Sequence, residues 1–590
     1  MENSGWNMYV FRDGRRSVAG QRLVSELRDC LAALTQESGL SHHGSGKSQC
    51  WGASRDRLLD ALIAAGELEC ALLDAGAEQA GCAAIITDAV AEMLVGAASG
   101  RGELIGEHSI RQLLARLEPF APPRQLNLSV HEGFAYYALH PLKVVDVLQY
   151  ILPGSDTGVA PPVAVLGIRS IGVTLSAVLT AALKERGYAA NRLTVRPDGH
   201  PYDRRLALNG QQMAWIEAHQ GAEFMVADEG PGLSGSSFLA VAEALVAAGV
   251  PQHKILLIGS RQPDVAQLRS ANAVERWSRF RFVCMASHPY PPKGAAIAIA
   301  GGEWRREFLP DAGELPACWT QLEMAKFLSA DRHLFFKFEG FGHFGGDIGR
   351  RASALAAARL GPTYLGNESG FGIYQLSPGR ALTSPVSERP RRLKHLADYC
   401  AFRRREFQAD DSQPSAIDEM ASWNWSLEFG DSSGPTPVEV ARRVFCDAHM
   451  MPHEWLEGPD GRLLKLDGGA HGDDHFFPGP CDIAWDLAGT IVEWNLTAAE
   501  AEYFCQQYRR ASGDDARRRL PPYLRAYVSF RMGWCKMAAL ASQGSFDEPL
   551  LWRDFERYRG YAARLSGSAR AVAHPVIDLH ANSTPTGPAA

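Results

Sequence analysis

The sequence has no apolar run long enough to cross a membrane, because no uninterrupted stretch reaches the roughly 18 apolar residues that a spanning helix needs. The N-terminal residues Met1–Met8 are polar and contain no secretory signal core. The 11 cysteines are scattered and include no Cys-x-x-Cys pair. This odd count without pairing favours reduced thiols and an intracellular compartment. We therefore predict a cytoplasmic protein.

The sequence also lacks a strong excess of charge of one sign. With 60 Lys and Arg against 67 Asp and Glu, the net charge is −7 and the pI is about 6.2. This balance gives no indication of a basic nucleic-acid groove or a polybasic membrane patch. We find no internal repeat. At 590 residues the chain is too long for a single hydrophobic core and predicts about three domains.

Shifts in composition divide the chain into regions. Helical patterns such as 57–73 alternate with Gly/Ser loops in the first part, where no strand ladder is evident. The Pro-rich stretch 119–124 then opens a region with predicted strands at 254–260 and 280–284, and a linker follows near 310–317. We predict four regions: a helical accessory region 1–120, an α/β domain 121–315, a second α/β domain 325–565, and a disordered tail 566–590.

The most informative stretch is an apolar strand that runs into two acids and a loop of small residues. Phe224–Ala227 is followed by Asp228 and Glu229, then by the Gly/Ser-rich loop 230–237 and a helical run over 238–249. Carboxylates at the end of a strand accept hydrogen bonds from sugar hydroxyls, whereas loop amides and hydroxyls hold a phosphate at the start of a helix. The pattern therefore predicts a sugar-phosphate site. Any parallel α/β protein can also end a strand in acids and turn through glycine, so this alternative stays open.

An earlier strand leads to a second loop of the same kind. The apolar run 162–168 is followed by Arg169, Ser170 and Gly172, and an apolar helix continues through 174–183. Arg169 can neutralise a diphosphate, and Gly172 allows the backbone to come close. Between the two loops, residues 194–205 are polar and turn-rich.

Together these segments resemble the type I phosphoribosyltransferases, whose signature is an apolar strand, two acids, a short spacer and a small Thr/Ser-Gly loop. The spacer Gly230–Leu233 is one residue longer than the usual pattern, and Glu229 replaces the commoner second Asp. The resemblance implies a parallel sheet and a Mg²⁺-dependent displacement at the ribose anomeric carbon, between phosphoribosyl diphosphate and a nitrogenous acceptor, or the reverse. It also implies that residues 194–205 form a flap over the diphosphate.

The resemblance assigns roles to individual residues. Asp228 and Glu229 become the catalytic pair that holds the ribose, and Arg169 contacts the diphosphate. The substrate-binding residues that it implies are Arg169, Ser170, Gly172, Arg196, Gly232, Ser234, Gly235, Ser236 and Ser237. One further segment, Gly44–Ser48, imitates the end of a Walker A loop, but Ser41 stands where that pattern needs its first glycine and no strand precedes it. We assign no nucleotide site to it.

The second half of the chain carries a different set of residues. A predicted strand over 334–338 contains Lys337 and precedes a glycine-rich turn with Gly342. Far downstream come Asp447, Asp467 and Asp486, the last within an Asp-Leu-Ala helix. This order resembles the aminoglycoside-phosphotransferase-like kinases. Phosphoryl transfer needs a base for the acceptor hydroxyl and Mg²⁺ at the phosphates, so the resemblance implies that Lys337 and Gly342 bind ATP, Asp447 is the catalytic base and Asp467 holds Mg²⁺.

Two departures weaken this second resemblance. Pro452 and His453 occupy the region where the family has its catalytic-loop Asn, and the helix after Lys337 offers Arg350 and Arg351 in place of the pairing glutamate. A kinase-like fold without activity therefore stays open. The run His471–His475 adds a candidate metal cluster, although such His/Asp runs are also common in solvated loops.

We predict an α/β multidomain protein in which a phosphoribosyltransferase-like parallel sheet is fused to a kinase-like α+β domain, with a helical region at the N-terminus. The predicted cofactors are Mg²⁺ and ATP, and the predicted partners are phosphoribosyl diphosphate and a nucleotide or base, without nucleic acid or membrane. Because the phosphoribosyltransferase family is often dimeric, a homodimer stays open. Two alternatives remain: a small-molecule kinase whose first half only binds nucleotides, and a ligand sensor without turnover.

Overall fold

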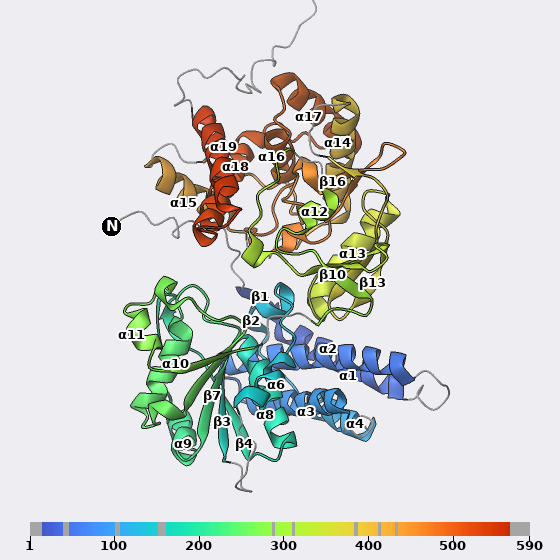
Figure 1. Ribbon diagram of the computed structural model, residues 1–590. Coiled ribbons are helices and arrows are strands. Elements are labelled where there is room, and N and C mark those ends of the chain that lie inside the picture. The colour runs from blue at the N-terminus through green and yellow to red at the C-terminus, as the bar shows by residue number, and fades with distance from the viewer. Residues whose placement is uncertain are drawn as a thin grey trace, which may run out of the picture. The chain divides into compact units, whose positions relative to one another are not determined.

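The computed structural model describes residues 15–38, 47–100, 107–151, 161–285, 290–309, 313–382, 388–410, 415–430 and 435–566. The chain forms two compact units (Figure 1). We call 15–290 together with 340–344 the N-terminal unit, and the described residues of 291–339 and 345–566 the C-terminal unit. Residues 44–46 of the Walker-like stretch and all but the first residue of the predicted tail lie outside the described residues.

The N-terminal unit contains more strands and helices than the C-terminal unit, and many of them are short. Its strands are β1 (Arg15–Ala19), β2 (Gln125–Ser129), β3 (Val163–Ile168), β4 (Ala190–Val195), β5 (Asp198–His200), β6 (Asp203–Arg205), β7 (Glu223–Ala227), β8 (Ile255–Gly259) and β9 (Arg281–Cys284). Its helices are α1 (Gly20–Ser38), α2 (Lys47–Asp74), α3 (Ala80–Ser99), α4 (Glu107–Leu117), α5 (Glu132–Ala135), α6 (Lys143–Asp146), α7 (Leu148–Ile151), α8 (Ile171–Glu185), α9 (Gly210–Ala218), α10 (Ser236–Ala247) and α11 (Ala273–Trp277).

A parallel five-stranded sheet forms the centre of the N-terminal unit. Its strand order is β4-β3-β7-β8-β9, and every neighbouring pair is parallel. All residues of β3 are buried, as is typical of a central parallel strand covered on both faces. Ala164, Leu166 and Ile168 share a core cluster with residues of α9 and α10, whereas the intervening Gly167 meets α8. The sheet is thus doubly wound, as Figure 1 shows.

The predicted elements that flank the two loops are confirmed. The apolar runs before Arg169 and before Asp228 form β3 and β7, and the helical runs that follow form α8 and α10. The predicted strands at 254–260 and 280–284 form β8 and β9. These elements could be predicted because their patterns are local. The strands are short apolar runs bounded by turn residues, and the helices are longer runs with helical periodicity.

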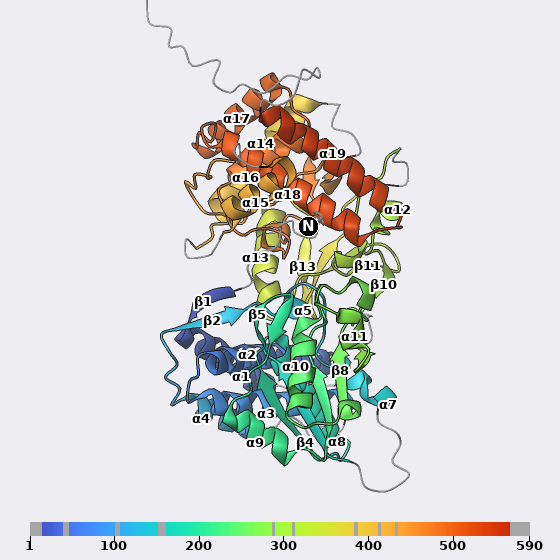
Figure 2. The same cartoon turned by 90° about the vertical axis from the view of Figure 1, so that its left-hand side faces the viewer.

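The helices before residue 120 belong to the same compact unit as the sheet. Helices α1, α2, α3 and α4 pack on one another, and α2 and α3 contact α8 (Figure 2). Gly66 of α2 allows this approach, since a Cβ there would lie 2.3 Å from Thr174 Oγ1. The region also contains β1, which pairs antiparallel with β2, although the sequence predicts no strand ladder there. The expectation of an all-helical first region is therefore wrong at β1, a short strand whose partner lies about 110 residues downstream.

The C-terminal unit combines antiparallel strands with long helices. Its strands are β10 (Ala295–Ala298), β11 (Lys326–Ser329), β12 (Leu334–Phe338), β13 (Tyr364–Glu368), β14 (Phe371–Gln375), β15 (Arg380–Ala381), β16 (Trp455–Glu457) and β17 (Leu463–Lys465). Its helices are α12 (Trp304–Phe308), α13 (His343–Ala357), α14 (Arg389–Glu406), α15 (Ile417–Phe429), α16 (Ala484–Glu493), α17 (Ala498–Ser512), α18 (Leu520–Ala541) and α19 (Glu548–Leu565).

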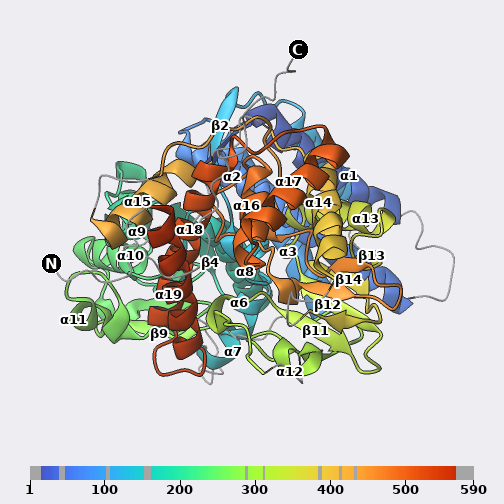
Figure 3. The ribbon, with the colours of Figure 1, turned by 90° about the horizontal axis from the view of Figure 1, so that it is seen from above.

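Five strands of this unit form one antiparallel sheet in the order β10-β11-β12-β14-β13, and β15-β16-β17 form a second. Helices α18 and α19 pack along each other, and α14 packs on α17 (Figure 3). The core cluster of the unit is rich in aromatic residues and includes Trp425, Trp455 and Trp485. In the part of the chain that the structure describes, the protein is therefore mixed α/β with one parallel and several antiparallel sheets, as predicted at the level of fold class.

Among the described residues, α3 is the one helix with the length and apolar composition that crossing a membrane requires, and half of its apolar window is buried in the unit. Core helices pass the same test, so this is weak evidence for a membrane span. Ten cysteines in the part of the chain that the structure describes are free thiols. Cytoplasmic localisation stays a prediction.

Candidate functional site

The two predicted loops of the N-terminal unit lie side by side at one edge of the sheet. β3 and β7 are neighbours, and Gly167 near the end of β3 is in register with Ala227 at the end of β7. Arg169 and Asp228 therefore follow adjacent strands. The chain continues from β3 to β4 on one side and returns to β7 on the other, so this is the point at which the strand order reverses. In open parallel sheets, ligands bind outside the carboxyl ends of the strands at such a point.

Asp228 and Glu229 are anchored by backbone amides. Asp228 Oδ1 accepts a hydrogen bond from the Glu229 amide at 2.8 Å, and Glu229 Oε2 accepts one from the Gly133 amide at 2.9 Å. Burial raises the pKa of Asp228 to about 7, and burial together with the neighbouring Glu132 raises the pKa of Glu229 well above its ordinary value. Burial also raises the pKa of Glu132 to about 7. Glu132 could not be predicted from the sequence, because α5 brings it to the acids from about 100 residues upstream.

The loop after β3 has a strained backbone and a tight contact. Ser170 has a φ of 119°, a conformation that side-chain-bearing residues rarely adopt and that tends to occur at functional sites. A Cβ at Gly172 would lie 2.7 Å from the Ala227 carbonyl oxygen. The close approach at Gly172 is therefore to the end of β7, and the approach to a diphosphate stays a prediction.

Arg169 and Arg196 share one carboxylate. Arg169 Nη1 lies 3.1 Å from Asp74 Oδ1, Arg196 forms an ion pair with the same carboxylate, and Arg196 Nη1 donates to the Arg169 carbonyl at 2.8 Å. Asp74 is the last residue of α2, so the helical region contributes to this edge of the sheet. Asp74 thus brings together the two arginines that were predicted to bind the diphosphate. The sequence analysis did not identify Asp74.

The Ser/Gly loop is covered by the hairpin β5–β6. Ser234 Oγ and Ser236 Oγ donate to the Pro201 carbonyl at 2.8 and 2.6 Å, and Pro201 is in the turn of that hairpin. Gly232 and Gly235 both have positive φ values, 58° and 69°. Helix α10 then begins at Ser236, with Ser237 in its first turn. The segment expected to form a flap is therefore a hairpin that lies over the predicted phosphate loop.

The C-terminal unit contains a pocket of about 550 Å³ whose lining includes Lys337, His449, Glu454, Asp467 and His471. Lys337 on β12 is almost fully buried and forms an ion pair with Asp467. His471 Nε2 lies 2.9 Å from the other oxygen of Asp467. Burial opposes ionisation, but His471 and Lys337 hold the pKa of Asp467 well below its ordinary range. Two residues about 130 positions apart, both predicted from the sequence, are therefore in direct contact.

Asp447 lies behind this pocket and is fully buried. It accepts a hydrogen bond from the Tyr399 hydroxyl, and Lys465 Nζ lies 3.4 Å from its Oδ1. Asp486 fixes the segment, because its two oxygens accept hydrogen bonds from the amides of Asp447 and Ala448 at 2.8 and 3.0 Å. Lys465 holds the pKa of Asp447 below its ordinary range in spite of burial.

The glycine-rich turn and the helix after it are placed differently from the expectation. Gly342 groups with the N-terminal unit and is not among the residues that line the pocket. Arg351 of α13 donates from Nε to the Gly469 carbonyl at 2.8 Å, whereas Arg350 is exposed and pairs with Asp347. Helix α13 therefore contacts the loop after Asp467 through Arg351. Lys337 forms its ion pair with Asp467 and not with a residue of α13.

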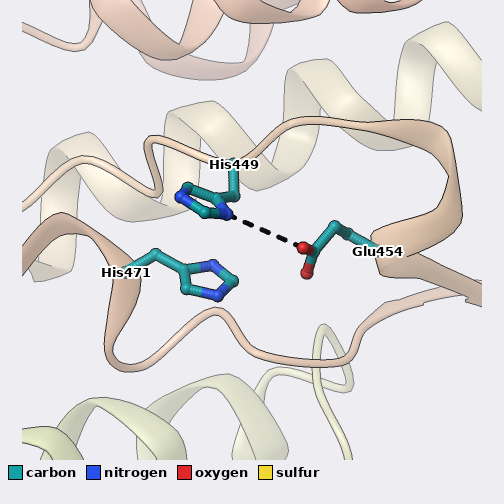
Figure 4. A group of neighbouring side chains, drawn as sticks. All are labelled: His449, Glu454 and His471. Carbon is teal, nitrogen blue, oxygen red and sulfur yellow. Dashed lines mark ion pairs between the residues drawn. The ribbon is translucent and has the colours of Figure 1, made fainter. Parts of the chain in front are cut away.

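Two imidazoles and a carboxylate that line the pocket lie next to one another (Figure 4). His449 and His471 are stacked, with ring centroids 4.0 Å apart, and His449 Nδ1 lies 3.7 Å from Glu454 Oε1. Burial lowers the pKa of His449 to about 4. His471 is the one residue of the described run His471–His475 that belongs to this group. Asp473 instead forms an ion pair with Arg351. Glu454 was missed by the sequence analysis.

No family model and no curated protein matches this chain. Solved structures similar to parts of it include an ethanolamine kinase from Plasmodium vivax, at 10% identity over 40% of this chain and 79% of that one, with a TM-score of 0.29. A choline kinase from Streptococcus pneumoniae is 17% identical over 41% and 89%, also at 0.29. A macrolide 2′-phosphotransferase from Brachybacterium faecium is 15% identical over 44% and 92%, at 0.26. TM-scores of this size do not establish a shared fold.

Proposed function

We propose that the C-terminal unit transfers a phosphoryl group from ATP to a small hydroxylated molecule. The observation that carries this proposal is the Lys337–Asp467 ion pair at the wall of the pocket, with Asp447 buried behind it. These three residues come from distant parts of the chain, in the order found in the kinase-like family that the sequence resembles, and they supply the groups that phosphoryl transfer uses. The pocket volume of about 550 Å³ is in the range of small-molecule sites.

Each residue has a role that its surroundings support. Lys337 is a buried cation that can exchange its Asp467 partner for a phosphate oxygen. Asp447 has a lowered pKa, so it suits orienting an acceptor hydroxyl by hydrogen bonding more than removing its proton in the ground state. Reaching a substrate requires Asp447 to be uncovered, since it is fully buried between Tyr399 and Lys465.

The residues present fit Mg²⁺ only in part. Mg²⁺ prefers oxygen ligands in octahedral geometry, and when bound it neutralises phosphate oxygens. Both oxygens of Asp467 are engaged, one by Lys337 and one by His471. The position five residues after Asp447 is Pro452, which has no side-chain oxygen. An ion at Asp467 would have to displace Lys337 or His471.

Calorimetry with the full chain tests this proposal. Wild type should bind ATP in the presence of Mg²⁺, and Lys337→Met should weaken binding at least tenfold, because a charge-assisted phosphate contact is lost. Arg350→Ala is the matched control, since Arg350 is a cation exposed on the neighbouring helix α13, and it should bind within twofold of wild type. Consumption of ATP with a panel of small alcohols and amino alcohols then tests turnover. Absence of ATP binding by wild type would refute the proposal.

A second function is favoured by the N-terminal unit. We propose that its sheet edge binds phosphoribosyl diphosphate, with Asp228 and Glu229 at the ribose, the loop 234–237 at the 5′-phosphate, and Arg169 and Arg196 at the diphosphate. The supporting observation is that all of these groups follow neighbouring strands at the point where the strand order reverses. The Pro201 carbonyl at present accepts the hydroxyls of the phosphate loop, so binding requires the hairpin to move.

Isothermal titration of the full chain with phosphoribosyl diphosphate, with and without Mg²⁺, tests this second proposal. Saturable binding followed by consumption of the ligand with a nitrogenous base would support a phosphoribosyltransferase, and binding without any product would support a sensor. A wild-type chain that does not bind the ligand under either condition would refute the assignment.

A further inference from the structure

We propose that His449, Glu454 and His471 bind a divalent transition-metal ion of the zinc class at the wall of the C-terminal pocket. Among the described residues these three are the group whose ligand atoms, one from each side chain, all lie within 4.8 Å of one another. A tetrahedral ion with bonds of about 2.1 Å needs ligand atoms roughly 3.4 Å apart. The 3.7 Å between His449 Nδ1 and Glu454 Oε1 is already close to that spacing. The site therefore needs only small side-chain shifts.

The Nδ1 atom of His471 is a second and independent observation. His471 is more than nine-tenths buried, and its Nδ1 makes no hydrogen bond, since the nearest carboxylate oxygen, Asp447 Oδ1, lies 3.6 Å away. Its Nε2 is held by the Asp467 carboxylate at 2.9 Å. A metal-binding histidine characteristically donates its other ring nitrogen to a carboxylate, which fixes the ring and its tautomer. The Asp467–His471 pair has that arrangement, and an ion at Nδ1 would replace the 3.6 Å contact of that nitrogen with Asp447 Oδ1.

The second oxygen of Glu454 is positioned in a similar way. Lys465 Nζ lies 3.1 Å from Glu454 Oε2, which leaves Oε1, the oxygen nearer to His449, for coordination. The backbone helps, since a tight 3₁₀ turn over Pro452–Glu454 brings Glu454 back toward His449, and a second turn begins at His471. Each of the three ligands is thus oriented by another residue or by a turn.

The donor set selects the kind of metal. Two imidazole nitrogens and one carboxylate oxygen suit Zn²⁺, Co²⁺ or Ni²⁺, whereas Mg²⁺ and Ca²⁺ are held by oxygen ligands. All three residues line the pocket, so an ion with three protein ligands would have its remaining position toward the pocket. This is the pattern of a site that also binds water or substrate. The inference rests on these contacts and is independent of the proposed phosphotransfer.

The test uses the full chain stripped of metal with a chelator and titrated with Co²⁺, whose visible absorption bands report low-coordinate nitrogen and oxygen ligands. Wild type should bind one Co²⁺ per chain, and added Zn²⁺ should displace it and abolish the bands. His471→Ala and Glu454→Gln should each weaken Co²⁺ binding at least tenfold. His453→Gln is the matched control, because His453 lines the same pocket one residue before Glu454 but is not in the group, and it should bind Co²⁺ within twofold of wild type.

Asp467→Asn tests the supporting carboxylate, and a loss of ten- to a hundredfold in affinity is expected for such an outer partner. If His471→Ala does not fold by circular dichroism, His449→Gln replaces it. The inference is overturned if wild type shows no Co²⁺ bands and no Zn²⁺ uptake by calorimetry, or if the ligand variants bind as tightly as wild type. Lys337→Met separates this result from the proposed phosphotransfer, since it should lose ATP binding and still bind Co²⁺.

Discussion

Replacement of the Asp228 carboxylate by an amide should stabilise the N-terminal unit while weakening its proposed ligand binding. Asp228 lies beside Glu229 and Glu132 at the end of β7, and burial raises the pKa of its carboxyl to about 7 from an ordinary value of 3.8. The folded chain therefore holds a proton on Asp228 that the unfolded chain releases near pH 4. As the pH rises from about 4 to about 7, the unfolded state is increasingly favoured. Asp228→Asn removes this penalty.

The structure sets the size of the effect. The rise of the pKa corresponds, at about 1.4 kcal/mol per pKa unit, to an upper limit of about 4 kcal/mol above pH 7. Asp228 is only half-buried, and solvent screening reduces the gain to about 2 kcal/mol. The hydrogen bond from the Glu229 amide is retained, because an asparagine oxygen also accepts it. For a unit of this size the expected rise in Tm at pH 8 is about 4–8 °C.

Calorimetry at two pH values checks this prediction. At pH 5 only about a third of the stabilisation by Asp228→Asn should remain. That pH is already close to the unfolded-state pKa of the wild-type carboxyl, so protonating it on folding costs less. Asp203→Asn is the control, because Asp203 lies in the same unit on the exposed hairpin, and it should change Tm by less than about 2 °C. Phosphoribosyl diphosphate should raise the Tm of wild type and not that of Asp228→Asn. A lower Tm for Asp228→Asn at pH 8, or an equal rise at both pH values, would refute the electrostatic account.

Three further predictions concern arginines. Arg169→Ala and Arg196→Ala should each weaken the binding of phosphoribosyl diphosphate at least tenfold. In parallel titrations they should weaken the binding of a ribonucleoside 5′-monophosphate less than threefold, because that ligand has no diphosphate. Equal losses for both ligands would show that these residues are wrongly placed. Arg192→Leu leaves Glu69 buried without its bidentate partner, so the unfolding transition of the N-terminal unit should lose about 3–5 kcal/mol, and an unchanged calorimetric trace would contradict this. Arg305→Leu likewise breaks the buried pair with Asp547, and it should lower the other transition alone; a shift of both would mean that the two units do not unfold separately.

Local pattern in the sequence was sufficient to predict the elements that carry the site residues. The apolar runs that form β3, β7 and β12 end at Arg169, Asp228 and the residues after Lys337, and the glycines and serines after them end each strand where predicted. These features depend on side-chain periodicity and turn chemistry over ten to fifteen residues, which is why they are legible in one sequence. Lys337 and Asp467 were both predicted as site residues, whereas their direct contact was not predicted.

Only the tertiary structure decided which distant groups meet. Asp74 pairs with both Arg169 and Arg196, Glu132 lies beside Asp228 and Glu229, and Glu454 completes the group with His449 and His471. None of these partners is distinguished by its neighbours in sequence, because Asp, Glu and His on exposed turns have the same local patterns. The positions of Asp74 and Glu132 follow from the crossover connections of the parallel sheet and from the packing of α2 on α8. The position of Glu454 follows from the 3₁₀ turn over Pro452–Glu454 in the other unit. Sequence by itself therefore determined where each strand ends and which chemistry stands there, and the long-range packing determined the partners that set charge, pKa and metal affinity.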